Sequence, residues 1–146
     1  MATSDASTPP LRVLVDTNVA LDLFLQREPW ATEAQGLVSA YTQGKVVGYV
    51  PASALTDIFY ISRRIVGADK AFHVIDLCLS AFAVIAVDRA VIDQARTLPG
   101  ADFEDNVQIA CAQVAQLDAI VTRDATGFVH APMPTLAPKD VANQVK

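Results

Sequence analysis

Short apolar runs alternate along this chain with longer segments in which apolar residues recur every three or four positions. The runs have the length of strands and lie at residues 11–15, 46–50, 83–87 and 119–121, with a shorter one near residues 135–136. Such runs are typical of strands buried on both faces of a parallel sheet. Because helical segments separate them, we expect right-handed crossovers and a parallel sheet covered by helices on both faces.

Capping residues, glycines and prolines mark the ends of the expected helices. Asp88 is expected to cap one helix, and Gly44 and Gly67 are expected to end two others. The helices are expected from Thr17 or Asn18 to about residue 26, over residues 31–43, from Ser53 or Thr56 to residue 66, over residues 69–82, 88–97 and 102–115, and from Pro138 onwards.

The length of 146 residues suits one hydrophobic core, so we expect a single domain over residues 11–146. Residues 1–10 lack the basic start and apolar stretch of a signal peptide, and we expect a frayed tail there. No apolar run approaches the roughly 18 residues of a membrane span, which predicts a soluble, cytoplasmic protein without a membrane partner. The net charge of −5 means that bulk charge does not attract nucleic acid.

Four aspartates stand where strands are expected to pass into helices. Asp16 and Asp124 follow two of the apolar runs, whereas Asp57 and Asp105 lie in the first turns of expected helices. Ligands of open parallel sheets bind outside the carboxyl ends of the strands, so we expect these side chains to converge. One such aspartate alone is more often a helix cap, but four together indicate an acidic pocket for Mg²⁺ or Mn²⁺ that acts on a phosphate ester.

The sequence around these aspartates resembles the PIN domain family, which includes the VapC toxins of bacterial toxin–antitoxin pairs. The likeness runs in order through Asp16-Thr-Asn-Val, Leu-Thr-Asp57-Ile-Phe-Tyr, Asp102-Phe-Glu-Asp105 and Val-Thr-Arg-Asp124. The resemblance implies a three-layer α/β/α sandwich with five parallel strands and a Mg²⁺- or Mn²⁺-dependent ribonuclease that cleaves single-stranded RNA. It also implies that such a toxin has a cognate antitoxin and forms a homodimer.

The resemblance assigns roles to individual residues. The catalytic, metal-binding quartet of the family corresponds to Asp16, Asp57, Asp105 and Asp124. The polar supports of the family correspond to Thr17, Asn18 and Thr122. Asp57 departs from the glutamate usual in VapC toxins, so its side chain is one methylene shorter.

Asp102 and Asp105 compete for the third acidic position. They are three residues apart, so both could line one face of a helix. Because Pro99-Gly100 precedes them closely, we expect Asp102 to cap the helix as a supporting residue and Asp105, one turn in, to face the metal. Glu104 is expected to point elsewhere.

A metal-activated water makes a histidine base unnecessary, so His73 and His130 are expected to have no catalytic role. Arg123, beside Asp124, is the first candidate for contact with RNA phosphates, and Arg64 is the second. Arg64 also stands in the last turn of its expected helix, where it would complement the helix dipole or meet acidic groups of an antitoxin. Trp30 belongs either to the core or to a partner surface.

Other functions fit the sequence less well. A haloacid-dehalogenase-like phosphatase needs a second aspartate where this chain has Asn18, and a signalling receiver needs an aspartate and a lysine that the middle of the chain lacks. A catalytically weak or inactive PIN-like domain that binds protein or RNA is the alternative that stays open. Calorimetric measurement of metal binding would separate it from a nuclease.

Overall fold

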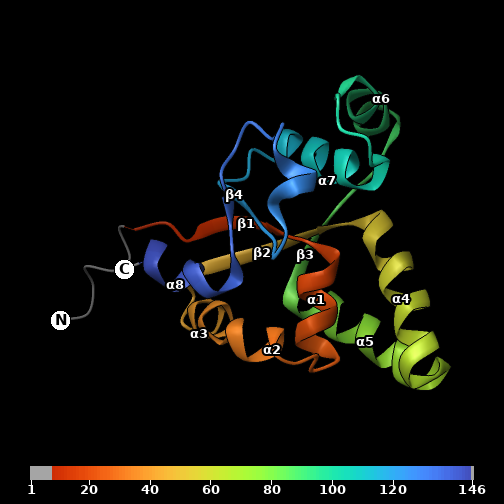
Figure 1. Ribbon diagram of the computed structural model, residues 1–146, viewed down its shortest axis with the longest axis vertical. Helices are drawn as coiled ribbons and strands as arrows, with labels where there is room; N and C mark the ends of the chain where they lie inside the picture. Colours follow the sequence, from red (N-terminus) through yellow and green to blue (C-terminus); the bar gives the residue numbers. More distant parts are fainter. Residues whose placement is uncertain (1–7, 146) are drawn as a thin grey trace.

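The computed structural model describes residues 8–145, which contain a five-stranded sheet with every strand parallel to its neighbours (Figure 1). The strands are β1 (Leu11–Val15), β2 (Val46–Pro51), β3 (Phe82–Ile85), β4 (Ala119–Val121) and β5 (Thr135–Leu136). Their order across the sheet is β3-β2-β1-β4-β5. All five expected strands are present. Most of the tail predicted at residues 1–10 lies outside the described residues.

Helices cover both faces of the sheet, which confirms the predicted three-layer sandwich (Figure 1). One face carries α1 (Thr17–Phe24), α2 (Trp30–Glu33), α3 (Gln35–Thr42), α4 (Ala52–Val66), α5 (Ala68–Ala81) and α8 (Val141–Gln144). The other face carries α6 (Arg89–Thr97) and α7 (Phe103–Val114). Two short 3-10 helices, η2 (Ala125–Phe128) and η3 (Pro138–Asp140), flank β5. Within residues 8–145 no helix has the length and apolar character needed to cross a membrane.

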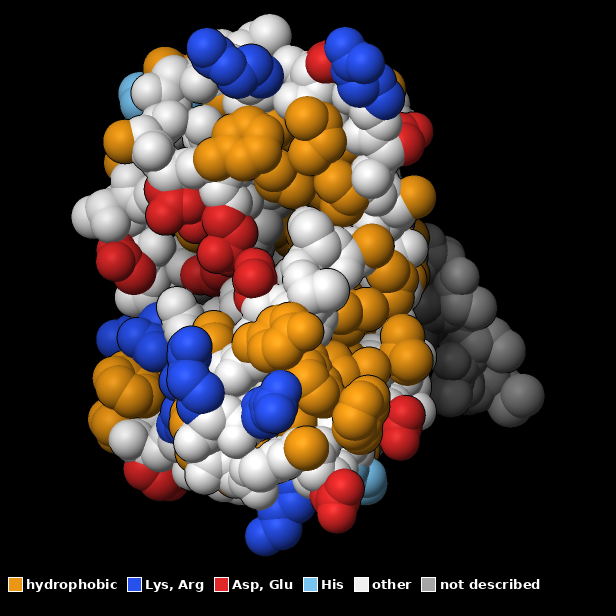
Figure 2. All heavy atoms as spheres, turned by 90° about the vertical axis from the view of Figure 1, so that its right-hand side faces the viewer, with side chains coloured by type: hydrophobic (Ala, Val, Ile, Leu, Met, Phe, Trp, Pro, Cys, Tyr) orange, Lys and Arg blue, Asp and Glu red, His pale blue; other side chains and the backbone are white. Residues whose placement is uncertain are grey.

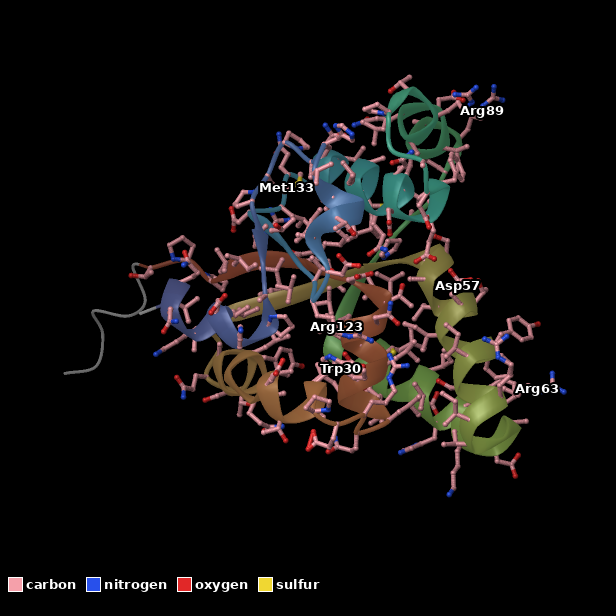
Figure 3. All side chains as sticks on the ribbon, viewed as in Figure 1. Trp30, Asp57, Arg63, Arg89, Arg123 and Met133 are labelled. Carbon is pink, nitrogen blue, oxygen red and sulfur yellow. The ribbon has the colours of Figure 1, made fainter. Side chains whose placement is uncertain are left out.

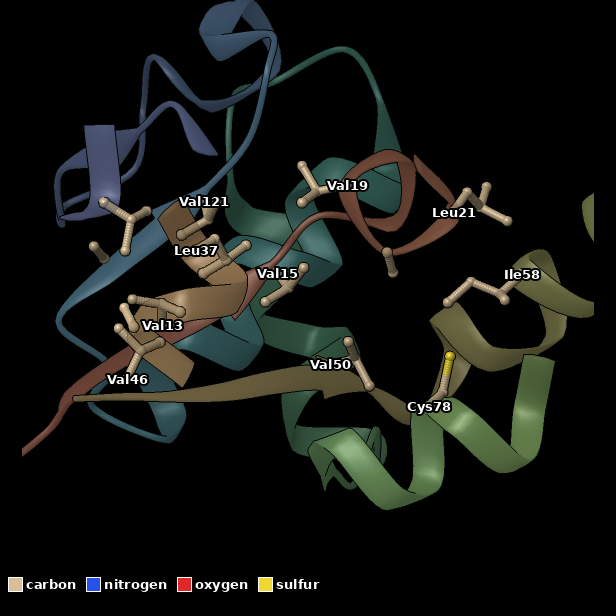
Figure 4. Packing of buried hydrophobic residues seen from close by; sticks show 14 of the residues in the cluster. Val13, Val15, Val19, Leu21, Leu37, Val46, Val50, Ile58, Cys78 and Val121 are labelled. Carbon is tan, nitrogen blue, oxygen red and sulfur yellow. The ribbon is translucent and has the colours of Figure 1, made fainter. Parts of the chain in front are cut away.

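Successive residues of the central strand face opposite layers, as the two-residue period of a strand requires. Val13 and Val15 are fully buried in a cluster with residues of α1, α3, α4 and α5 (Figure 4). Leu14, between them, is buried in a second cluster with Ile120 and with residues of α6 and α7. The apolar run of β1, interrupted only by Arg12, is therefore explained by the burial of Val13, Leu14 and Val15 on both sides of the sheet.

Most boundaries differ from the sequence prediction by one or two residues; for example, the third strand ends at Ile85 and not at residue 87, and the first helix ends at Phe24 and not near residue 26. The single helix expected over residues 31–43 was wrong, because the chain breaks into α2 and α3 at Ala34, whose φ of −86° and ψ of 3° interrupt the helical path. The third strand starts at Phe82 and not at residue 83, since α5 ends at Ala81. The expected caps are present: Asp88 accepts a hydrogen bond from the Val91 N–H at 3.0 Å, and Gly44 and Gly67 adopt positive φ.

The order of the strands places a topological switch between β1 and β4. From β1 the chain moves through β2 to the β3 edge, and it then returns on the opposite side of β1 to form β4 and β5. The carboxyl ends of β1 and β4 are held side by side, because the Asp16 N–H donates to the Val121 carbonyl oxygen at 3.0 Å. Such a switch is where open parallel sheets bind their ligands.

Candidate active site

Asp16 follows β1 directly, and both of its carboxylate oxygens are held in place. Thr122 Oγ1, at the end of β4, donates to Asp16 Oδ2 at 2.9 Å. Gln108 Nε2, on α7, donates to Asp16 Oδ1 at 3.1 Å. Asp16 is 9% exposed, and both of these side-chain donors are neutral. The carboxylate is therefore oriented but keeps its negative charge uncompensated.

The start of α7 supplies three more acidic side chains. Asp102 caps the helix, because its Oδ1 accepts from the Asp105 N–H at 3.0 Å. Asp105 reaches across to η2, where its Oδ2 lies so close to Gly127 that a β-carbon there would collide with it. The cap geometry agrees with the supporting role predicted for Asp102. It also leaves Asp105 as the side chain that projects toward the segment after β4.

Asp124 lies in a tight turn after β4. Its Oδ1 accepts from the Thr126 N–H at 3.1 Å and from Thr126 Oγ1 at 2.7 Å. Thr122 Oγ1 also accepts from the Asp124 N–H at 3.1 Å, so the same hydroxyl contacts Asp16 and the turn that carries Asp124. Thr122 thus connects Asp16 to this turn, as a polar support would, and Asp124 is exposed.

These side chains line one cavity of 660 Å³ at the carboxyl edge of the sheet. Figure 2 shows acidic side chains gathered at a hollow across the middle of that face. The acidic residues of the lining are Asp16, Asp102, Glu104, Asp105 and Asp124. No lysine or arginine is among the residues that line it within the described part of the chain. This excess of carboxylates, with no basic residue among them, favours a cation, or a ligand that brings cations with it, over an unaccompanied anion.

Mutual repulsion and burial change the protonation of this cluster. Burial, followed by the charges of Asp102 and other acidic neighbours, raises the pKa of Asp105 to about 6. Burial and the charge of Asp57 also raise the pKa of Glu104, against the hydrogen bond from Thr17. The bonds from Thr126 lower the pKa of Asp124. The shifts of Asp105 and Glu104 indicate that negative charge accumulates around the start of α7.

Asp57 lies in a second, adjoining cavity. This cavity measures 300 Å³ and is lined by Thr17, Asn18, Asp57, Tyr60, Ile61, Arg64 and Glu104. Asn18 and Glu104 line both cavities, so the two form a continuous acidic groove. The predicted quartet is therefore divided: Asp16, Asp105 and Asp124 line one cavity, and Asp57 projects from α4 into the next (Figure 3).

The expectation that Glu104 points elsewhere was wrong. Glu104 lines both cavities, and its Oε1 accepts from Thr17 Oγ1 at 3.3 Å and from Gln108 Nε2 at 3.4 Å. Glu104 and Gln108 are four residues apart on α7 and so share the helix face that meets Asp16. The buried Gln108 was itself missed. The available signal was an amide at Gln108 between Val107 and Ile109, within the apolar part of the helix.

Arg123, the first candidate for RNA contact, has other partners. Its Nε bonds to the buried carboxylate of Asp22 at 2.8 Å, and its guanidinium lies 4.0 Å from the centre of the Trp30 ring (Figure 3). Arg27 Nε bonds to the other oxygen of Asp22 at 2.8 Å. Arg123 therefore acts in a structural ion pair and lines neither cavity, whereas Arg64 lines the second one. Trp30 serves as the platform for this arginine and is 37% exposed.

The two histidines differ in position. His73 is exposed on α5, as expected for a residue without a role, whereas His130 lines the acidic cavity behind η2. The position of His130 at the acidic cavity was not predicted from the sequence. The 3-10 helix η2, which brings the loop back over the cavity, has no clear periodic signal in the sequence.

The donor set suits a hard divalent cation, since carboxylate oxygens are what Mg²⁺ and Mn²⁺ bind. Within residues 8–145, no three acidic, histidine or cysteine side chains lie close enough to hold an ion without other ligands. Mg²⁺ commonly takes only one or two carboxylates and completes its shell with waters and substrate phosphates. One or two of Asp16, Asp105 and Asp124 as direct ligands would fit that pattern, and a cation among them would relieve the repulsion that, together with burial, raises the pKa of Asp105.

Fold and site together define a parallel α/β protein with an acidic cavity at its topological switch. The sequence model of the PIN domain family matches residues 12–126, so the chain belongs to this family. No curated protein matches the chain in sequence.

Several solved structures share the fold at low sequence identity. The toxin VapC20 from Mycobacterium tuberculosis, described as cleaving the sarcin-ricin loop, is 16% identical, with a TM-score of 0.67 over 83% of this chain and 95% of that one. DNA-bound VapBC from Salmonella typhimurium is 14% identical, with a TM-score of 0.66 over 88% and 98%. A toxin–antitoxin complex from Klebsiella pneumoniae is 20% identical, with a TM-score of 0.64 over 86% and 97%.

Proposed function

We propose that this protein is a Mg²⁺- or Mn²⁺-dependent endoribonuclease that hydrolyses phosphodiester bonds of single-stranded RNA and serves as the toxin of a toxin–antitoxin pair. One observation carries the proposal: the buried Asp16 carboxylate, held by neutral donors, faces four more carboxylates in a cavity lined by no lysine or arginine. Membership of the PIN domain family and the fold shared with VapC20 support it.

The residues of the cavity have separable tasks in hydrolysis. Thr122 and Gln108 fix the orientation of the Asp16 carboxylate, and Gly127 leaves the space that the Asp105 carboxylate needs. A bound divalent ion supplies an activated water and stabilises negative charge on the phosphate. The water oxygen bonds to phosphorus, the ester bond to the departing oxygen breaks, and that oxygen takes up a proton.

The test is incubation of the purified protein with single-stranded RNA, double-stranded RNA and single-stranded DNA, each with Mg²⁺, Mn²⁺ or excess EDTA. We expect cleavage of single-stranded RNA with either metal and none in EDTA. The matched control is Asp16→Asn, purified in the same way, because it reports any contaminating ribonuclease. Cleavage by the wild type in EDTA contradicts the metal dependence. If no nucleic acid is cleaved, the chain is a binding module.

The toxin role adds an antitoxin and a homodimer as partners. An apolar pocket of 510 Å³ between α1, α3 and the sheet supports a protein partner, because Val38 and Tyr41 at its rim are 37% and 43% exposed. The test is co-purification with the product of a neighbouring short reading frame, if one is present. Val38→Glu should weaken this association, whereas Val114→Glu, at an exposed position at the end of α7 on the other face of the sheet, should not. Sedimentation of the protein alone measures the dimer.

A further inference from the structure

The cavity that holds Asp57 differs in character from the acidic cavity beside it. Four of its lining residues, Asp57, Tyr60, Ile61 and Arg64, follow the spacing i, i+3, i+4 and i+7, so they form one face of α4. Arg64 is the only arginine or lysine among the residues that line either cavity within the described part of the chain. Figure 2 shows basic and hydrophobic side chains directly beside the acidic hollow.

We propose that this second cavity is a base-binding subsite, in which Tyr60 stacks on the base of a nucleotide next to the scissile phosphate and Arg64 contacts that nucleotide's phosphate. The inference rests on the proposed ribonuclease function and adds to it a determinant of substrate recognition. Unpaired bases of single-stranded RNA are bound in proteins by stacking on aromatic rings and by hydrogen bonds to their edges. The cavity offers groups for both.

Tyr60 is a supported and accessible ring. Its side chain is 58% exposed, and the Phe59 ring meets it edge-on, with the ring centres 5.2 Å apart. Phe59 in turn packs against Phe72, whose ring centre lies 4.7 Å away. The Tyr60 hydroxyl makes no hydrogen bond within residues 8–145. This arrangement buttresses one side of the ring and leaves surface for a ligand, as in proteins that bind single strands.

Arg64 provides the positive charge that this groove otherwise lacks. It forms no ion pair with another residue of the described chain, whereas Arg27, Arg89 and Arg123 do. A polyanion that enters the acidic groove is repelled by six carboxylates, five in the first cavity and Asp57 in the second, unless cations oppose them. Arg64, on the helix face that carries Asp57, is placed to hold a phosphate beside the cavity where cleavage is proposed.

Asn18 supplies polar groups between the two cavities. It lines both of them, and its side-chain oxygen accepts only a long hydrogen bond of 3.4 Å from Arg27. Its amide N–H groups are therefore available to an acceptor on a base edge. Tyr60 thus borders a cavity lined by a guanidinium, an amide and a carboxylate, those of Arg64, Asn18 and Asp57, which favours a base with its phosphate over an apolar side chain.

The test measures binding of a short single-stranded RNA by fluorescence anisotropy, in an Asp16→Asn background that keeps the RNA intact, with Mg²⁺ present. Abasic versions of the same RNA, with the missing base moved along the strand, serve as the second probe. Tyr60→Ala should weaken binding of the intact RNA by about tenfold, as is usual when an aromatic partner of a base is lost. When the missing base is the one that would occupy the subsite, the abasic RNA should bind the parent and Tyr60→Ala with equal affinity. Tyr60→Phe should bind like the parent.

Arg64→Ala should weaken binding of intact and abasic RNA alike. It should also reduce the slope of log affinity against log salt concentration by about one, the value for one lost phosphate contact. Arg63→Ala is the matched control, since Arg63 is its neighbour in sequence, is exposed and does not line the cavity.

If wild type cleaves RNA but Tyr60→Ala binds and cleaves it unchanged, the subsite is overturned and the nuclease stands. A changed sedimentation coefficient with unchanged RNA affinity would assign Tyr60 to a protein interface and overturn the subsite too. If wild type neither cleaves nor binds RNA, both proposals fail.

Discussion

Two aspartates beside α1 are buried to a similar degree, and their surroundings differ. Asp22 is 2% exposed and lies between two guanidinium groups, those of Arg27 and Arg123, each at 2.8 Å. Asp16 is 9% exposed and is held by the neutral side chains of Thr122 and Gln108. One buried charge is neutralised within the protein, and the other is only oriented by it.

We propose that this difference distinguishes a structural carboxylate, Asp22, from a functional one, Asp16. Burying a charge without a partner is costly, so a protein that stays folded with one normally meets the charge with a ligand. Asp22 needs no ligand, because its arginines already supply the opposite charge. Asp16 faces further acids, so a cation is the ligand that would complete its surroundings. Four predictions, in decreasing order of expected effect, examine this contrast.

The largest effect is expected for Asp16→Asn. The substitution removes a charge from a repelling cluster and deletes a proposed metal ligand, so activity should fall by on the order of a thousandfold, equivalent to about 4 kcal/mol of transition-state stabilisation. In EDTA the variant should melt at the same temperature as the parent or higher. Cleavage rates and thermal melts measure the two effects.

Gln108→Leu is the matched variant for the orientation of Asp16. It keeps the carboxylate and removes one neutral donor, so activity should fall less, by roughly ten- to a hundredfold. If Asp16→Asn melts well below the parent in EDTA, the carboxylate is chiefly a structural cap, and the contrast with Asp22 disappears.

The second effect is expected for Asp22→Asn and concerns stability. It leaves two arginines facing a neutral amide, and breaking a buried ion pair costs about 3–5 kcal/mol. Because the two arginine side chains are 25% and 27% exposed, we expect a loss of about 2–3 kcal/mol. Chemical denaturation measures the loss, and cleavage at a temperature where the variant is folded should stay within a few-fold of the parent. An unchanged unfolding midpoint would mean that the pair contributes nothing net.

The fold could be predicted because each strand is a continuous apolar run and each helix has periodic apolar residues. The convergence of Asp16 and Asp124 followed from the same pattern, since parallel strands end at one edge. The break at Ala34 was not predicted; Gly36, two residues further on, weakens the helix locally, but a single glycine inside a helical pattern does not fix where the helix breaks.

The side-chain partners could not be predicted from the sequence for a different reason. Arg123 and Asp22 are 101 residues apart, and nothing local indicates which of several acids an arginine will meet. The direction of Glu104 depends on the residue at which α7 starts, since each residue along a helix turns the side chain by about 100°. Packing of the whole fold decides which distant side chains form ion pairs and at which residue a helix starts.

The third effect separates the two aspartates at the start of α7. We expect Asp105→Asn to lower activity by at least about tenfold, because its side chain projects toward the proposed metal. Asp102→Asn should lower activity much less and should cost about 1 kcal/mol of stability, since Asp102 caps the helix. Rates and melting temperatures of both variants decide between the roles. Activity that survives Asp105→Asn but not Asp102→Asn, at equal stability, would reverse the assignment.

The smallest effect is a dependence of stability on pH in the metal-free protein. Burial, with the neighbouring charges added, raises the pKa of Asp105 from 3.8 to about 6 in the folded state. The folded protein therefore holds this proton more tightly than the unfolded chain. The resulting stabilisation is fully present below about pH 4 and is lost as the pH rises through about 6.

Thermal melts in EDTA across this pH range, for the parent and for Asp105→Asn, isolate the contribution of this carboxyl. Both proteins carry a neutral side chain at this position at low pH and only the parent acquires the repelling charge, so the melting temperature of Asp105→Asn should rise relative to that of the parent as the pH rises. Mg²⁺ should remove the loss, since it binds the ionised form. Curves that stay parallel in EDTA would mean that the repulsion around Asp105 is already relieved without a metal. The negative charge of the acidic cavity would then be compensated by groups of the protein itself, as the charge of Asp22 is. The contrast between the two buried carboxylates would then not identify the functional one.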